Sequence, residues 1–190
     1  MGDDQKDIFL NAAKEAWDWF QKVGLINSDN LINDGVDTNT CKNNGDTAFS
    51  YNQGVIIGGL VELYHATGEE SYLDKASDIA DAVTRPGSQL LTDEGILVDV
   101  CDRNGDCGGD GVQFKGVFTR NLSKLLSVRQ SDQWVTFLET NAQSIWTNSL
   151  KIEDNRCKVG VYWGGPYTDA DASSQSSGLD CLVAAFAATF

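Results

Sequence analysis

The sequence of 190 residues is poor in positive charge: 14 lysine and arginine residues stand against 28 aspartate and glutamate residues, for a formal net charge of −14. No basic run is present. This excludes nucleic acid as a partner, because binding to a phosphate backbone requires a positively charged footprint. The same acidity excludes docking to an anionic membrane surface. A neutral or cationic partner fits this composition best.

Long hydrophobic runs are also missing from the sequence. No stretch approaches the run of about 18 apolar residues that marks a membrane-spanning helix. Residues 1–4 are acidic and lack the basic-then-apolar pattern of a secretory signal peptide. Hydrophobic residues make up 41% of the chain and charged residues 22%, which is a globular composition. We expect residues 1–190 to form a single domain with a real core.

No long segment alternates apolar and polar residues with a period of two, and the sequence contains only two prolines. Apolar residues recur instead three and four positions apart, a spacing typical of amphipathic helices. Six such stripes predict helices near residues 9–20, 56–64, 72–83, 117–126, 134–145 and 179–186. The predicted fold class is therefore all-α. Two connections are short, at 66–69 and 127–131, and the other three run to roughly 25 residues, a length that usually indicates function.

Three glycines stand at the starts of alternate predicted helices. Gly54, Gly116 and Gly178 follow one another at spacings of 62 residues (116 − 54 and 178 − 116). Each long loop also contains a short β-like piece that begins with glycine, at 35–37, 95–99 and 160–163. Three copies of one helix–loop–helix unit explain this pattern. Because glycine weakens a helix, its recurrence predicts close approach of a neighbouring backbone or of a ligand.

The five cysteines point to an oxidising compartment, because four of them lie in polar segments where buried thiols are not expected. Cys181 differs, since apolar residues surround it, and we interpret it as a core thiol. Cys101 and Cys107 are close enough in sequence to staple a short loop. No Cys-x-x-Cys pair or Cys/His cluster supports zinc.

One loop imitates a calcium site without completing it. Asp102, Asn104, Asp106 and Asp110 follow the spacing of such a loop, but Gln113 stands where the final glutamate belongs. We therefore expect no metal, and no residue pattern indicates a cofactor.

Ordered motifs over nearly the whole chain resemble glycoside hydrolase family 76, the endo-α-1,6-mannanases and related fungal cell-wall mannosidases. The most distinctive is the segment 49–64, Phe49-Ser50-Tyr51-Asn52-Gln53-Gly54-Val55-Ile56-Ile57-Gly58-Gly59-Leu60-Val61-Glu62-Leu63-Tyr64. Further matches follow in order at 91–97, 114–122, 141–146, 163–166 and 175–180. The resemblance implies an (α/α)6 toroid of six helical hairpins, with a glycan cleft where the inner helices start. Three units supply half that ring, so the chain is expected to be the C-terminal half of such a domain.

The resemblance also implies a function. The chain would belong to a retaining glycoside hydrolase that acts on the neutral polysaccharide α-1,6-mannan, by hydrolysis or by transglycosylation. In that reaction one aspartate protonates the leaving oxygen and a second attacks the anomeric carbon. The family's catalytic pair, two adjacent aspartates followed by tryptophan, belongs to the N-terminal half, which would be a missing partner segment. Asp3-Asp4 lacks the tryptophan, and neither it nor the Asp169/Asp171 pair is assigned. The catalytic residues are left unknown, and the location implied is extracellular or the cell wall.

Seven matched residues are predicted to bind the glycan, and each has a plainer alternative role. Amide, hydroxyl or cationic groups suit sugar hydroxyls, and aromatic rings suit the faces of pyranoses. Asn52 could instead cap its helix, Arg120 could pair with an acid, and Trp163 could anchor its loop. The other four tryptophans lie on apolar stripes and are predicted to be core. The predicted set is Tyr51, Asn52, Gln53, Phe114, Lys115, Arg120 and Trp163.

Two other functions stay open at this point. The chain could be a non-catalytic glycan-binding module or pseudoenzyme, or a helical-repeat interaction protein without a role in sugar chemistry. Half a toroid should also expose the apolar faces that normally meet its other half, in a patch larger than a few hundred Å².

Overall fold

The computed structural model describes residues 3–189, and its regular structure is mostly helical. All six predicted helices are present, so the all-α prediction is confirmed. The helices are α1 (Asp3–Val23), α2 (Ser50–Thr67), α3 (Glu70–Thr84), α4 (Val100–Asn104), α5 (Phe114–Leu126), α6 (Asp132–Ser144) and α7 (Ala172–Thr189), with a 3-10 turn η1 (Gly111–Gln113) and a π-helical segment η2 (Ile145–Ser149). The short helix α4 was not predicted, because five residues are too few to show a helical period.

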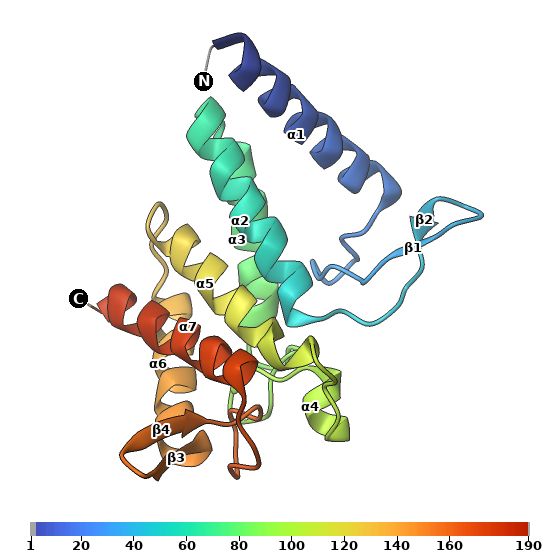
Figure 1. Cartoon of the computed structure of the whole chain (residues 1–190). Helices are drawn as coiled ribbons and strands as arrows, with labels where there is room; N and C mark the ends of the chain where they lie inside the picture. Colours follow the sequence, from blue (N-terminus) through green and yellow to red (C-terminus); the bar gives the residue numbers. More distant parts are fainter. Residues whose placement is uncertain (1–2, 190) are drawn as a thin grey trace.

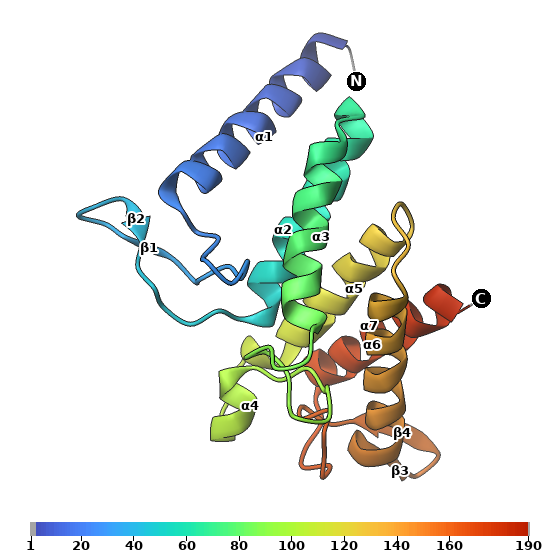
Figure 2. The ribbon, with the colours of Figure 1, turned by 180° about the vertical axis from the view of Figure 1, so that it is seen from behind.

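The long helices form two layers (Figures 1 and 2). Helix α2 packs against α5, and α5 packs against α7, so these three helices make one layer. Helices α3 and α6 contact each other behind that layer, and α1 lies beside α2 at one end. Each helix of the first layer follows a long loop, and short turns lead from α2 to α3 and from α5 to α6. This order is the predicted unit of outer helix, long loop and inner helix, repeated three times.

The repeated glycines are the points where neighbouring inner helices approach most closely. A Cβ atom on Gly54 of α2 would lie 2.6 Å from the Cα of Phe118 in α5. A Cβ on Gly116 of α5 would lie equally close, 2.6 Å, to the Cα of Ser177 in α7. In the third unit, Gly178 faces the side chain of Val159 instead. The prediction of a close backbone neighbour is therefore confirmed at Gly54 and Gly116, whereas at Gly178 the close neighbour is a side chain.

The β-like pieces of the long loops are only partly as predicted. The first one falls in a two-residue hairpin of β1 (Val36–Asp37) with β2 (Lys42–Asn43). The second forms an isolated bridge between Leu91 and Leu97. The third was wrong in position, because the hairpin of β3 (Leu150–Glu153) with β4 (Arg156–Val159) ends just before Gly160.

The core lies between the two layers, whereas apolar side chains remain exposed at both ends of the layer stack. Large apolar side chains are exposed on α1 at one end and on η2 and α7 at the other: Ile8, Phe9, Trp19, Trp146, Leu179, Val183 and Phe186. The prediction that the four stripe tryptophans are core is right for Trp134, at 2% exposure, and wrong for Trp19 and Trp146. Trp17 is intermediate, since it is partly buried and packs against the core. The rings of Trp19 and Trp146 sit on helices that have no neighbour on their outer side within the described chain, which fits half of a larger ring.

None of the helices within residues 3–189 combines the length and the apolar composition needed to cross a membrane.

Candidate functional site

An aromatic cluster marks the place where α2 and α5 begin. The ring centroids of Tyr51 and Phe114 lie 4.3 Å apart, and that of Phe49 lies 5.4 Å from Phe114. Tyr51 and Phe114 are both partly exposed. The close approach of α2 and α5 at Gly54 brings these two rings together from positions 63 residues apart in sequence (114 − 51). Partly exposed, paired rings of this kind offer an apolar platform for a flat ligand.

A carboxylate is held beside that platform. Asp34, which follows the first short bridge of the loop, is exposed and accepts hydrogen bonds from the Tyr51 hydroxyl at 2.5 Å and the Asn52 amide at 2.9 Å. Burial and the hydrogen bond to Asp34 raise the pKa of Tyr51, so its hydroxyl stays a donor. The Asn52 amide oxygen also accepts from the backbone N–H of Phe49, at 3.0 Å. Asn52 therefore caps α2 and orients Asp34 with the same side chain.

Gln53 lies beneath the surface and fastens the preceding loop. Its side chain has 0% exposure. The amide nitrogen donates to the carbonyl oxygens of Ile32 and Phe49, both at 2.9 Å, and the amide oxygen accepts from the N–H of Ile32 at 2.8 Å. Since these bonds occupy the whole amide, Gln53 places the loop that carries Asp34 and offers no exposed group itself.

Asp99 makes the equivalent connection from the second long loop. Its carboxylate is fully buried and accepts from the backbone N–H of Ser50 at 2.7 Å and from the Ser50 hydroxyl at 2.6 Å. The free N–H group of Ser50, the first residue of α2, is thus satisfied by a residue from the neighbouring unit. Burial raises the pKa of Asp99, against the opposing effects of the Ser50 hydrogen bonds and the Lys115 charge.

Lys115 is buried at the start of α5. Its ammonium lies 2.6 Å from Oδ2 and 2.7 Å from Oδ1 of Asp102, and both side chains have no exposed surface. The same ammonium lies over the ring of Trp163, 5.6 Å from its centroid. A disulfide between Cys101 and Cys107 flanks Asp102, as the spacing predicted. Lys115 therefore joins α4, α5 and the third long loop below the aromatic platform.

Trp163 anchors its loop within the core. Its exposure is 0%, and its carbonyl oxygen accepts from the hydroxyl of Ser144 in α6 at 2.9 Å. The ring is therefore not exposed to solvent. Of the two roles considered for Trp163, stacking on a sugar and anchoring its loop, its placement matches the anchor. Arg120, by contrast, is exposed and pairs with Asp180 of α7 at 3.0 Å.

The remaining polar candidates have structural partners. The carboxylate of Asp171 accepts from the N–H of Ser174 at 2.8 Å and caps α7. The side chains of Asp3 and Asp4 lie outside the described residues. Cys181 is buried as predicted, while Cys41 and Cys157 are exposed thiols.

One group of potential metal ligands occurs in the part of the chain that the structure describes. It consists of Cys101, Asp102 and Cys107. The two sulfurs are joined in the disulfide, and the carboxylate is paired with Lys115, so this group does not fit a metal ion.

The predicted residues thus separate into two depths. Tyr51, Asn52 and Phe114 meet at the surface, and Gln53, Lys115 and Trp163 lie buried below them. Arg120 stands nearly two turns beyond Phe114 in α5. The carboxylates of Asp34, Asp99 and Asp102 were missed as members of this site. The signal available was their placement within the two long segments that lead into the glycine-containing helices α2 and α5.

Two layers of helices with long loops gathered at the starts of the inner helices define an α/α-toroid arrangement of the glycoside hydrolase type. Residues 3–189 match the family described as "Glycosyl hydrolase family 76", and the chain belongs to that family.

Solved structures agree with this assignment. The arrangement superposes with a TM-score of 0.80 on an inactive variant of the α-1,6-mannanase GH76A of Salegentibacter sp. HEL1_6 in complex with α-1,6-mannotetrose, at 30% identity over 96% of this chain and 53% of that one. The Lin0763 protein of Listeria innocua gives a TM-score of 0.79 at 28% identity, over 95% of this chain and 49% of that one. A curated relative, the mannan endo-1,6-α-mannosidase DFG5 of Candida albicans, is 27% identical over 186 residues.

The chain spans about half the length of these relatives. The match includes 93% of this chain but only 40% of the Candida albicans protein. The three helix–loop–helix units of this chain therefore match only part of the length of each relative.

Proposed function

We propose that residues 1–190 are the C-terminal half of a retaining glycoside hydrolase that acts on α-1,6-mannan by hydrolysis or transglycosylation. The observation that carries the proposal is the platform of Tyr51 and Phe114 beside Asp34, in a fold that superposes on a mannotetrose-bound mannanase. Pyranose rings can pack on the aromatic faces, and Asp34 can accept hydrogen bonds from sugar hydroxyls.

In this proposal the buried residues position the exposed ones. Gln53 and Asp99 fix the two loops at the start of α2, and Lys115 fixes the third loop through Trp163. Arg120 lies nearly two turns beyond Phe114 along α5, where its exposed guanidinium, paired with Asp180, can reach a longer glycan.

The two catalytic carboxylates are proposed to come from the other half of the domain. The solved Salegentibacter variant is inactive with alanine at two consecutive aspartates, in a chain of which this one covers 53%. A retaining mechanism needs two carboxyl groups about 5 Å apart, one as acid and one as nucleophile. The disulfide between Cys101 and Cys107 supports an extracellular or cell-wall location, because disulfides persist in oxidising compartments.

A fusion protein tests this function directly. The N-terminal part of the Salegentibacter mannanase, joined ahead of residue 3, should complete the ring and cleave α-1,6-mannotetrose. The matched control carries the two aspartate replacements and should bind without cleaving. This chain alone should bind the tetrasaccharide and release no product. Cleavage by the chain alone, or a lack of binding by the chain alone, would overturn the proposal.

A further inference from the structure

A groove on the outer layer, lined by none of the residues of the aromatic platform, has the chemistry of a second carbohydrate site. We propose that this groove, along one face of α6, binds a neutral oligosaccharide chain independently of the site at the start of α2 and α5. The identity of the sugar rests on the proposed function, whereas the site itself is inferred from the residues described below.

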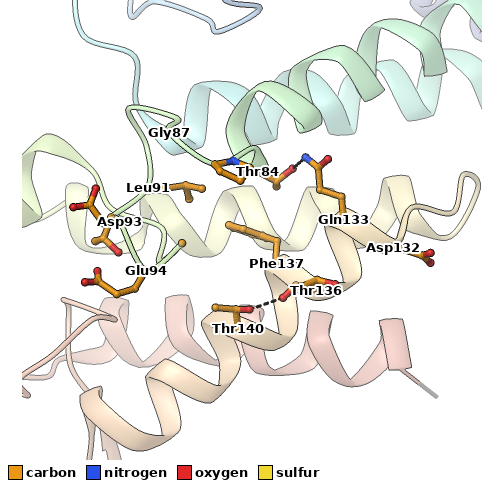
Figure 3. A pocket seen from close by; sticks show the side chains of 13 residues that line it. Thr84, Gly87, Leu91, Asp93, Glu94, Asp132, Gln133, Thr136, Phe137 and Thr140 are labelled. Atoms are coloured by element: carbon orange, nitrogen blue, oxygen red, sulfur yellow. Dashed lines mark hydrogen bonds between the residues drawn. The ribbon is translucent and has the colours of Figure 1, made fainter.

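The groove is made of two joined cavities. One of about 570 Å³ lies between the end of α3, the loop that follows it and α6 (Figure 3). The next one, of about 650 Å³, continues toward Tyr162 and shares Thr92, Glu94 and Thr140 with the first. The shared residues make the two cavities one continuous channel on the surface.

The wall formed by α6 and η2 presents polar, uncharged groups in a line. Gln133, Thr136, Thr140, Gln143 and Thr147 are spaced alternately three and four residues apart, so they share one helix face. The ten residues from the first glutamine to the second rise about 15 Å, a length that accommodates several sugar rings. Part of their capacity is used within the protein: Gln133 donates to the Thr84 hydroxyl, and Gln143 donates to the Thr147 hydroxyl. The Thr140 hydroxyl donates to the Thr136 carbonyl oxygen. The remaining N–H groups and lone pairs of these amides and hydroxyls suit sugar hydroxyls.

Three acidic side chains border the groove, and their carboxylates are free. Asp93 and Glu94 lie on the loop side, as Figure 3 shows, and Asp132 lies at the start of α6. None of these three side chains has a hydrogen bond or ion pair with another residue of the described chain. Lysine, arginine and histidine are absent from the described lining of both cavities. Free carboxylates accept hydrogen bonds from hydroxyls and repel anionic polymers, so a neutral glycan fits and a charged one of the same sign does not.

Nearly buried apolar side chains form the floor, with Phe137 at 5% and Leu91 at 7% exposure, and a partly exposed ring lies at the far end. The Phe137 ring points toward Leu91 across the first cavity (Figure 3). Tyr162 is partly exposed at the second, and a Cβ on Gly164 would lie 2.9 Å from Cζ of its ring. Only glycine at position 164 allows the Tyr162 ring to lie this close against the loop, where it forms an aromatic face on the groove.

The backbone of the wall is irregular where the groove turns toward Tyr162. Residues Ile145–Ser149 form a π-helix, and Thr147 and Asn148 of this segment line the second cavity. Segments of π-helix are rare and occur frequently at functional sites, because they redirect side chains from the regular helical face.

Amide NMR of the full chain during titration with α-1,6-mannotetrose tests the proposal. The signals of Thr92, Thr140 and Gln143 should shift saturably. Tyr162→Ala should raise the dissociation constant measured from these signals at least about tenfold, whereas Tyr162→Phe, which keeps the ring, should bind like the wild type. Gln143→Ala, at an exposed position, should also weaken binding and keeps the test valid if Tyr162→Ala does not fold.

The signals near Phe114 separate this inference from the proposed function. In Phe114→Ala, the groove signals should still shift while those at the start of α5 should not. Groove signals that do not move with the wild-type chain, or that move equally in Tyr162→Ala and Gln143→Ala, would overturn the second site whatever happens at Phe114.

Discussion

The ammonium of Lys115 lies 2.6 Å from Oδ2 of Asp102, and neither side chain has any exposed surface. Asp102 comes from α4 and Lys115 from α5, and the same cation contacts the ring of Trp163 from the third long loop. One buried charge pair therefore ties together the loops that lie beneath the aromatic platform. Its geometry links the stability of the fold to the shape of the proposed glycan site.

Removing one member of this pair should destabilise the protein strongly. Lys115→Met leaves the Asp102 carboxylate buried without a cation, which costs about 3–5 kcal/mol. The double variant Lys115→Met/Asp102→Leu removes both charges and should lose much less stability. Urea unfolding followed by circular dichroism measures both. A single variant as stable as the wild type would contradict the burial of this pair.

The contact between inner helices should make one glycine intolerant of a methyl group. Gly116→Ala places a Cβ 2.6 Å from the backbone of Ser177 and should lower the free energy of unfolding by about 1–3 kcal/mol. Gly59→Ala in α2 is the matched control, because its Cβ would meet nothing within 4 Å. The control should gain about 1 kcal/mol from better helix propensity. Thermal unfolding of the two variants should therefore shift in opposite directions, and equal shifts would count against the packing.

Asp99 should make stability depend on pH in a particular direction. Burial raises the folded-state pKa of Asp99 above its unfolded value. The stability that this group contributes is then fully present below the unfolded pKa, about 3.9, and is lost as the pH rises through the folded pKa. Asp99→Asn cannot ionise, so its free energy of unfolding relative to wild type should increase over that range. Chemical unfolding at several pH values measures the difference, and a difference independent of pH would contradict the assignment.

The exposed apolar ends should bind a hydrophobic dye. Phe9 on α1 is 63% exposed and Val183 on α7 is 57% exposed, and these ends are proposed to face the other half of the ring. The isolated chain should increase the fluorescence of ANS and self-associate, and the Phe9→Ser/Val183→Ser variant should do both less. A monodisperse wild-type monomer that does not increase ANS fluorescence would contradict the proposal that these faces pack against another half of the ring.

The six long helices and their order could be predicted from the sequence because each has an apolar stripe, and a glycine or proline follows the first three. Gly68, for example, ends α2 in the left-handed conformation at φ 74°, as its position before α3 suggests. The close approach at the three glycines also followed from their equal spacing. Helix α4 and the β3–β4 hairpin did not follow, since both are short and are stabilised by contacts with distant segments.

The site was harder to predict than the fold, because burial at a helix start depends on loops far away in sequence. Trp163 lies in a loop, and its burial results from Lys115 and Ser144, which no local pattern reveals. Trp146 was predicted to be core from its apolar stripe, but its side chain is 59% exposed. Asp34 gave no signal of its own, and Tyr51 and Asn52 define its role only once the loop folds back on α2.

The most direct test of the central claim is a crystal structure of this chain with α-1,6-mannotetrose. We expect sugar rings packed on Tyr51 and Phe114, with a sugar hydroxyl donating to the carboxylate of Asp34. Crystals in which these rings stay uncovered at saturating tetrasaccharide, with the sugar bound elsewhere or not at all, would contradict the claim that the glycan lies across the starts of α2 and α5.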